Sequence, residues 1–223
     1  YTILHIYTKD FGRVSYMVAR KRGKRSSVSQ ALFMPLSVLD LEVEHQNKRD
    51  IQRIKEVHLA FSASSFQLDP VKNVLALFLS EVLFRVVKDT QPDERMYAFL
   101  TDSVRILDSV EQGLANFHVA FLLNLLHYLG IFPNVEHPRD ALYFDMLNGI
   151  FVCQQPAHPY YLQPAETVVF QRLLKMSYEN MSLYAFSRQD RVRILHRIFE
   201  YYQLHLPDFK EIRSLQILQS LFD

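Results

Sequence analysis

The residues of this sequence best suited to chemistry are cations in a short stretch near its N-terminal end. Residues 12–25 read GRVSYMVARKRGKR, and six of these fourteen positions carry a positive side chain. They are Arg13, Arg20, Lys21, Arg22, Lys24 and Arg25. Clustered cations attract phosphate groups, and the attraction weakens as salt is added. The stretch therefore predicts a phosphate-binding element, although a solvated hairpin loop without a ligand would have the same composition.

Positive charge is concentrated in the N-terminal part of the chain. The net charge is only +1, but residues 1–61 hold eleven Lys and Arg against six Asp and Glu. Residues 62–223 hold fourteen against eighteen, so the two parts carry +5 and −4. Three more cations of the first part, Lys48, Arg49 and Arg53, extend the candidate site. This asymmetry predicts two modules with different partners.

The elements that must position these cations are short strands. Apolar and polar residues alternate in four segments, which predicts strands over 2–7, 13–19, 36–43 and 51–61. Four such strands separated by polar turns predict a small antiparallel β-barrel, with its first strand upstream of Tyr1. Tyr7 and Tyr16 could stack on the bases of a single strand, but we expect both in the barrel core.

A helical part follows. From Asp69, a suitable N-cap, and Pro70, a favoured first residue, the apolar period changes from 2 to 3.6. We expect helices over 71–88, 93–112, 115–129, about 165–180, 188–206 and 211–222, and an irregular, proline-rich insert at about 131–164. The predicted fold class is multi-domain α+β, with a β domain at 1–62 and an all-helical domain at 63–223.

A second group of cations lies on the helix expected after Ser187. Its members are Arg188, Arg191, Arg193 and Arg197. Arg193 and Arg197 share a helix face because they are four residues apart. An ordinary solvated face is the preferred interpretation, and a second basic patch for DNA or for an acidic peptide is the alternative.

Residue types for metal or covalent chemistry are sparse. Cys153 is the single cysteine, and with His137 and His158 it does not supply the four ligands of a structural zinc site. No oxyanion loop accompanies Cys153, and five glycines form no phosphate-binding loop. We therefore predict no metal, no cofactor and no enzyme activity, and we expect Cys153 to be a small buried apolar residue.

Composition also bears on the compartment. Hydrophobic residues make up 49% and charged residues 22%, which excludes a wholly disordered chain. The longest apolar run, 74–87, contains Glu81 and Arg85 and is too short and too charged for a membrane span. With no signal-peptide pattern and no possible internal disulfide, we expect a cytoplasmic protein without a membrane partner.

Several segments, in their order and spacing, resemble a known family. They read IYTKDFGRVSYMVAR at 6–20, LFMPLSVLDLEV at 32–43, IQRIKE at 51–56, DPVKNVLALFLSEVL at 69–83 and ANFHVAFLLNLLHYLGIFP at 115–133. Together they resemble the bacterial RecO family of DNA repair proteins, in particular its Bacteroides-type members. The resemblance covers nearly the whole chain, and it lies in fold signatures without catalytic residues.

The resemblance implies an N-terminal OB-fold followed by a helical domain. It further implies a nucleoid-associated recombination mediator that binds single- and double-stranded DNA and anneals complementary strands. Its implied partners are RecR, the C-terminal tail of single-strand-binding protein (SSB) and, indirectly, RecA, which it helps to load onto SSB-coated DNA. Some relatives carry a four-cysteine zinc module in the irregular insert, a pattern from which this chain departs.

Two other functions stay open at this point. One is an RNA- or ribosome-associated OB-fold protein, which would bind folded RNA and fail to anneal single-stranded DNA. The other is a protein-interaction adaptor whose basic stretch contacts no nucleic acid.

Overall fold

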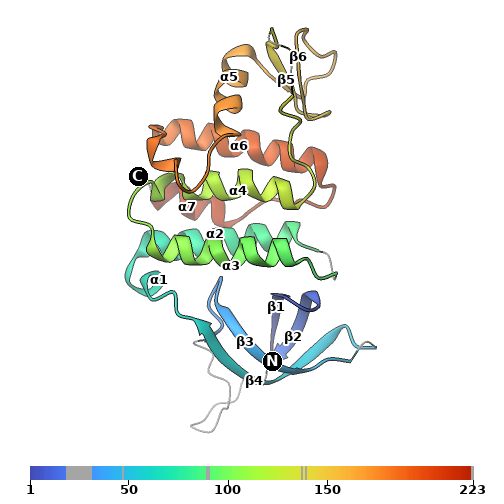
Figure 1. Cartoon of the computed structure of the whole chain (residues 1–223), viewed down its shortest axis with the longest axis vertical. Helices are drawn as coiled ribbons and strands as arrows, with labels where there is room; N and C mark the ends of the chain where they lie inside the picture. The colour runs from blue at the N-terminus through green and yellow to red at the C-terminus, as the bar shows by residue number, and fades with distance from the viewer. Residues whose placement is uncertain (19–31, 47, 89–90, 137, 139, 222–223) are drawn as a thin grey trace. The chain divides into compact units, whose positions relative to one another are not determined.

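A computed structural model of the chain describes residues 1–18, 32–46, 48–88, 91–136, 138 and 140–221 (Figure 1). Across these ranges an N-terminal sheet is followed by helices, the α+β class that the sequence predicts. The predictions for Arg20, Lys21, Arg22, Lys24, Arg25 and His137 fall outside these ranges. No helix within them is both long enough and apolar enough to cross a membrane.

The N-terminal sheet has four strands in the order β1-β2-β4-β3. They are β1 (Thr2–Thr8), β2 (Gly12–Val18), β3 (Val38–Glu44) and β4 (Ile51–Phe61). All four predicted strands begin and end within two residues of these bounds, because the alternation that marks them is strong.

Strand directions correct one expectation. β1 pairs with β2, and β3 with β4, in antiparallel fashion, but β2 and β4 are parallel, with Ser15 beside Ile51 and Met17 beside Arg53. The sheet is therefore mixed. β4 lies between β3 and β2, antiparallel to β3 and parallel to β2. β1 and β3 are its edges as far as the described residues show, and no pairing between them closes a barrel there.

Alternation along β2 fixes the core side of the sheet. Val14, Tyr16 and Val18 are buried, whereas Arg13, Ser15 and Met17 between them are half-buried. Tyr16 is only 1% exposed, and burial raises the pKa of its hydroxyl. The expectation that Tyr16 belongs to the core is confirmed.

The chain divides into two compact units. The first comprises Tyr1–Ser109 and Ile212–Leu218, and the second comprises Val110–Glu211 and Gln219–Asp223. The sheet thus shares a unit with the helices that follow it directly. The predicted domains 1–62 and 63–223, divided by type of secondary structure, stay a prediction.

The helices of the first unit are α1 (Ser65–Leu68), α2 (Pro70–Val86) and α3 (Glu94–Ser109). Asp69 caps α2 as predicted, because its carboxylate accepts hydrogen bonds from the backbone of Val71 and Lys72 at 2.8 and 3.3 Å. α2 is the buried helix of this unit, with Leu75, Phe78, Leu79 and Val82 at most 1% exposed.

The second unit contains the remaining helices. They are η2 (Leu114–Asn116), α4 (Phe117–Tyr128), α5 (Pro164–Leu173), η3 (Met181–Leu183) and α6 (Arg188–His205); α7 (Ser214–Leu221) spans both units. The predicted helix at 165–180 ends early, at Leu173. Asn180 organises a turn there instead, accepting from the Ser177 backbone at 2.8 Å and donating to the Lys175 carbonyl at 2.9 Å.

The insert predicted as irregular contains a small sheet. Its strands β5 (Tyr143–Asp145), β6 (Ile150–Val152) and β7 (Tyr161–Leu162) lie in the order β6-β5-β7. The buried Asp145 carboxylate accepts hydrogen bonds from the backbone of Leu147 and Asn148, both at 3.0 Å, and so shapes the β5–β6 turn. Gly149 closes that turn with a φ of 66°, and a Cβ on it would lie 2.8 Å from the Tyr201 hydroxyl.

The first unit is completed by a segment from near the chain's other end. Glu81 of α2 accepts hydrogen bonds from the backbone of Arg213 and Ser214 at 3.0 and 2.8 Å, and from the Ser214 hydroxyl at 2.6 Å. A carboxylate at the start of α7 stabilises that helix end. Burial acts to raise the pKa of Glu81, but these hydrogen bonds and the Arg85 charge outweigh it and lower that pKa.

Replacing Glu81 should therefore loosen the C-terminal segment. We expect Glu81→Gln to lower the free energy of unfolding at neutral pH by about 1 kcal/mol, the usual worth of a helix cap. Because the folded-state pKa is lowered, the contribution is present above the ordinary Glu pKa and is lost as pH falls through the lowered value. The difference between wild type and variant should thus close in acid.

Denaturant unfolding over a pH series measures this difference. Glu94→Gln is the control, because the Glu94 side chain is 80% exposed and, among the described residues, forms an ion pair with the solvated Lys9 alone, at 3.4 Å. A gap that is independent of pH would contradict the assignment.

Candidate nucleic-acid interface

An exposed face of the N-terminal sheet combines cations with apolar side chains. Met17 of β2 lies beside Ile3 of β1 and beside Arg53 of β4, so the three share one face. Ile3 is 50% exposed and Arg53 is also exposed. This face, with Ile51 and Lys55 further along β4, is called the sheet surface below.

Lys55 belongs to this surface and was missed from the sequence. The β3–β4 register shifts between Glu42 and Val43, so Lys55 has no partner across the ladder, and its side chain is exposed. The spacing of two residues from Arg53 on a predicted strand was the signal that could have found it.

The turn between β3 and β4 is held by one buried amide. Gln52 is 3% exposed, and its side chain accepts from the Gln46 backbone at 2.9 Å. It also donates to the carbonyls of Gln46 and Arg49 at 2.9 and 2.6 Å. Both ends of the turn are thereby fixed, and the exposed side chains of Lys48 and Arg49 project from a rigid support.

The cations of the turn and of β4 have free side chains. Those of Lys48, Arg49, Arg53 and Lys55 form no ion pair or hydrogen bond with the part of the chain that the structure describes. Unpaired surface cations keep their full charge for an external anion. Arg53 lies beside Met17, and β2 ends at the next residue, Val18. The sequence continues from there into the basic stretch.

Arg13 differs from these cations. Its guanidinium donates to the carbonyls of Phe84 and Val87 at 3.0 and 2.8 Å and lies 4.7 Å from the centre of the Phe84 ring. A cation at the end of α2 satisfies open carbonyls and interacts favourably with the helix dipole. Burial lowers the pKa of Arg13. This geometry gives Arg13 a structural role, and its contact with phosphate stays a prediction.

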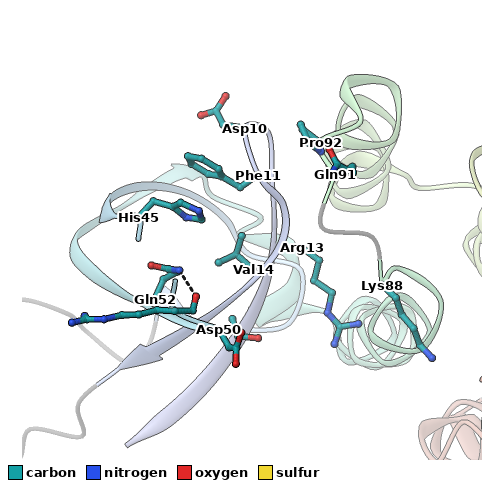
Figure 2. Close-up of a pocket in the computed structure, with 12 residues that line it drawn as sticks. Asp10, Phe11, Arg13, Val14, His45, Asp50, Gln52, Lys88, Gln91 and Pro92 are labelled. Atoms are coloured by element: carbon teal, nitrogen blue, oxygen red, sulfur yellow. Dashed lines mark hydrogen bonds between the residues drawn. The ribbon is translucent and has the colours of Figure 1, made fainter. Parts of the chain in front are cut away.

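A cleft of about 590 Å³ lies beside the β3–β4 turn, within the first unit (Figure 2). It is lined by the start of β2, by the turn between β3 and β4, and by Lys88, Gln91 and Pro92 after α2. Its volume lies in the range of pockets for small molecules, which is typically about 300–1,000 Å³.

The arginines of α6 all have partners. Arg193 pairs with Asp190 at 2.6 Å, and Arg197 lies between Glu166 and Glu200 at 2.9 and 2.8 Å. Hydrogen bonding to Glu166 raises the pKa of Arg197. These carboxylates offset the positive charge of the α6 face.

The other two arginines of α6 donate to backbone carbonyls. Arg188 reaches Gln219 at 3.1 Å, and Arg191 reaches Phe186 at 2.8 Å. An interaction of α6 with DNA or an acidic peptide stays a prediction.

Cys153 is not buried as expected. It is half-exposed, and its thiol donates to the Asp140 carboxylate at 3.3 Å, which raises the pKa of Cys153. Cys153 follows directly after β6, a short strand whose residues Ile150 and Val152 are also not buried. Among the described residues, no three His, Cys, Asp or Glu side chains gather as metal ligands. His158 instead bonds to the Asp145 carboxylate at 3.3 Å.

Comparison with known proteins defines the class. A family model for the N-terminal part of recombination protein O matches residues 1–63, and the model for its C-terminal part matches residues 67–215. Sheet and helices thus correspond to the two parts of a recombination protein.

Individual relatives match over more than nine tenths of their length. The chain is 40% identical to the DNA repair protein RecO of Azobacteroides pseudotrichonymphae, over 100% of this chain and 92% of that one. It is 38% identical to the DNA repair proteins RecO of Phocaeicola vulgatus and Bacteroides fragilis, over 99% of this chain and 91% and 92% of theirs. The chain belongs to the RecO family, which confirms the resemblance seen in the sequence.

The buried amide of the turn provides a test of this geometry. Gln52→Leu keeps the volume but leaves one N–H and two carbonyls without their partner, so we expect a loss of about 1–3 kcal/mol in the free energy of unfolding. Denaturant unfolding measures it. Gln46→Ala is the control, because within the described part of the chain the Gln46 side chain donates to the exposed Glu44 alone, and its loss should change stability by less than about 0.5 kcal/mol. Equal losses of stability in the two variants would show that the Gln52 side chain does not hold the turn.

Proposed function

We propose that this chain acts in DNA repair and recombination as a non-enzymatic mediator that binds single- and double-stranded DNA. One observation supports this most directly. In a member of the RecO family, the free cations Lys48, Arg49, Arg53 and Lys55 follow one another along the β3–β4 turn and β4, and Arg53 lies beside Met17, near the end of β2 from which the sequence continues into the basic stretch. Free cations on a rigid sheet are suited to phosphates, and apolar side chains beside them are suited to exposed bases.

The sheet order supports an OB-fold for the N-terminal part. The second, third, fifth and fourth strands of an OB-fold are neighbours in that order, and its third and fifth strands run parallel. β1, β2, β4 and β3 have this order, and β2 and β4 are parallel. The edge strands carry the half-buried apolar residues Leu4, Ile6, Leu41 and Val43, which a strand paired with β1 and β3 would cover.

The proposed mechanism is electrostatic. The sheet surface and the basic stretch hold two DNA backbones near each other and offset the repulsion between their phosphates. Sequence selection is left to base pairing, because no pattern for reading base edges is present. The helical part is proposed to dock the SSB tail and RecR, so that RecA is loaded indirectly. No cofactor and no zinc are part of this mechanism.

The salt dependence of DNA binding tests the cations of the sheet surface together with Arg49 of the adjoining turn. Each phosphate contact contributes about 0.7 to the slope of log affinity against log salt for a single strand. Replacing Arg49, Arg53 and Lys55 with Ala should lower the magnitude of that slope by about 2, as measured by fluorescence anisotropy over a salt series.

The matched control replaces Arg193 and Arg197, whose charges carboxylates already offset, and should leave the slope nearly unchanged. If the control lost as much of the salt slope as the variant of Arg49, Arg53 and Lys55, the assignment of the interface to the sheet would be contradicted in favour of α6.

An annealing assay tests the activity itself. Wild type should accelerate pairing of complementary oligonucleotides coated with SSB, and replacing Arg20, Lys21, Arg22, Lys24 and Arg25 with Ala should abolish most of that acceleration at moderate salt. Tight binding of folded RNA without annealing would favour the RNA-associated alternative. Unchanged annealing by the variant would show that the basic stretch is not the DNA-binding element.

A further inference from the structure

We infer that the cleft beside the β3–β4 turn binds one unpaired nucleotide of a DNA strand, with its base against Phe11 and its phosphate at Arg49. This inference rests on the proposed function and adds to it a specific preference for unpaired DNA. The cleft lies within the first unit, and the residues proposed to contact the nucleotide belong to its lining.

One wall of the cleft is a stack of two rings. The centres of Phe11 and His45 are 4.0 Å apart with 7° between their planes, the geometry of parallel stacking. Figure 2 shows the two rings together, with Arg13 directed away from them toward the helix. Phe11 is still 37% exposed, so its ring retains surface on which a base can continue the stack.

The position of Phe11 is fixed in advance of any ligand. The Thr8 hydroxyl accepts from the Phe11 backbone at 3.0 Å and donates to the Gly12 carbonyl at 2.9 Å. Gly12 has a φ of 61°, a conformation that glycine adopts without strain. A ring held by its own turn loses little conformational freedom on binding, and this favours affinity.

Charge in the lining suits a single phosphate. The cations are Arg13, Arg49 and Lys88, and the acids are Asp10 and Asp50. Arg13 is engaged by two carbonyls, whereas the Arg49 guanidinium has no partner among the described residues. The two carboxylates disfavour a second phosphate and can accept hydrogen bonds from base N–H groups. The balance thus matches one nucleotide.

Size and access exclude duplex DNA from this site. A volume of about 590 Å³ takes a single nucleotide, not a double helix. A paired base lies inside its stack and reaches such a pocket only after it is extruded. Duplex bound on the sheet surface therefore leaves the cleft empty, and a single strand enters it.

Replacement of Phe11 tests this preference. Phe11→Ala should weaken binding of a single-stranded oligothymidylate about five- to tenfold, the low end for one lost base–aromatic stack, and leave binding of a duplex unchanged. Phe11→Tyr keeps the ring and should bind as wild type does. Arg49→Ala should lower the magnitude of the salt slope by about 0.7, the share of one phosphate contact, whereas Phe11→Ala should leave the slope unaltered. Thermal unfolding checks that the variants stay folded.

A direct signal is available because the chain contains no tryptophan. In Phe11→Trp the only indole would lie at the cleft, and single-stranded oligothymidylate should quench its fluorescence while duplex should not. Quenching by free thymidine monophosphate at equal nucleotide concentration would point to a mononucleotide site and overturn the inference.

The possible failures are distinguishable. Wild-type protein that binds neither form of DNA would refute the proposed function, and the inference with it. If wild type binds DNA and Phe11→Ala leaves that binding intact, or weakens it equally for single strand and duplex, only the inference about the cleft is refuted.

Discussion

The parallel pairing of β2 with β4 is the constraint on which the candidate interface depends. It sets Met17 beside Arg53, and it brings the turn before β4 to the start of β2, where the cleft lies. Because parallel strands cannot be joined by a tight turn, the chain must leave the sheet between them. The basic stretch belongs to that connection in the sequence, and the free cations of the β3–β4 turn and of β4 lie along the strand that pairs with β2.

Local patterns predicted the strands well and the contacts poorly. Alternation located all four N-terminal strands, but nothing local indicates that β4 chooses β2, or that the Arg13 guanidinium reaches carbonyls at residues 84 and 87. The small sheet of the insert was missed because strands of two or three residues are too short to show a period. The helix expected to reach residue 180 was wrong, because the Asn180 side chain bonds to a nearby carbonyl and favours a turn.

Counting cations proved a weak guide to where charge is available. Four arginines on α6 form a stronger sequence signal than the pair Arg53 and Lys55, yet Asp190, Glu166 and Glu200 offset the charge of that helix. The cations of the sheet and its turn have no such partners in the described ranges. Hydrogen-bond partners distant in the sequence thus decide which positive side chains can meet a polyanion, and these appear only when the chain is folded.

The hydrogen bonds of Glu81 to residues 213 and 214 also govern the order in which the protein can be completed on the ribosome. The first compact unit contains Ile212–Leu218, which is synthesised only after all of Val110–Glu211 has been made. Until then the Glu81 carboxylate of α2 lacks its hydrogen bonds to residues 213 and 214, although Arg85 of the same helix is already beside it. Completion of the first unit is thereby coupled to translation of the second, so that a prematurely terminated chain would lack a finished first unit as well as its missing helices.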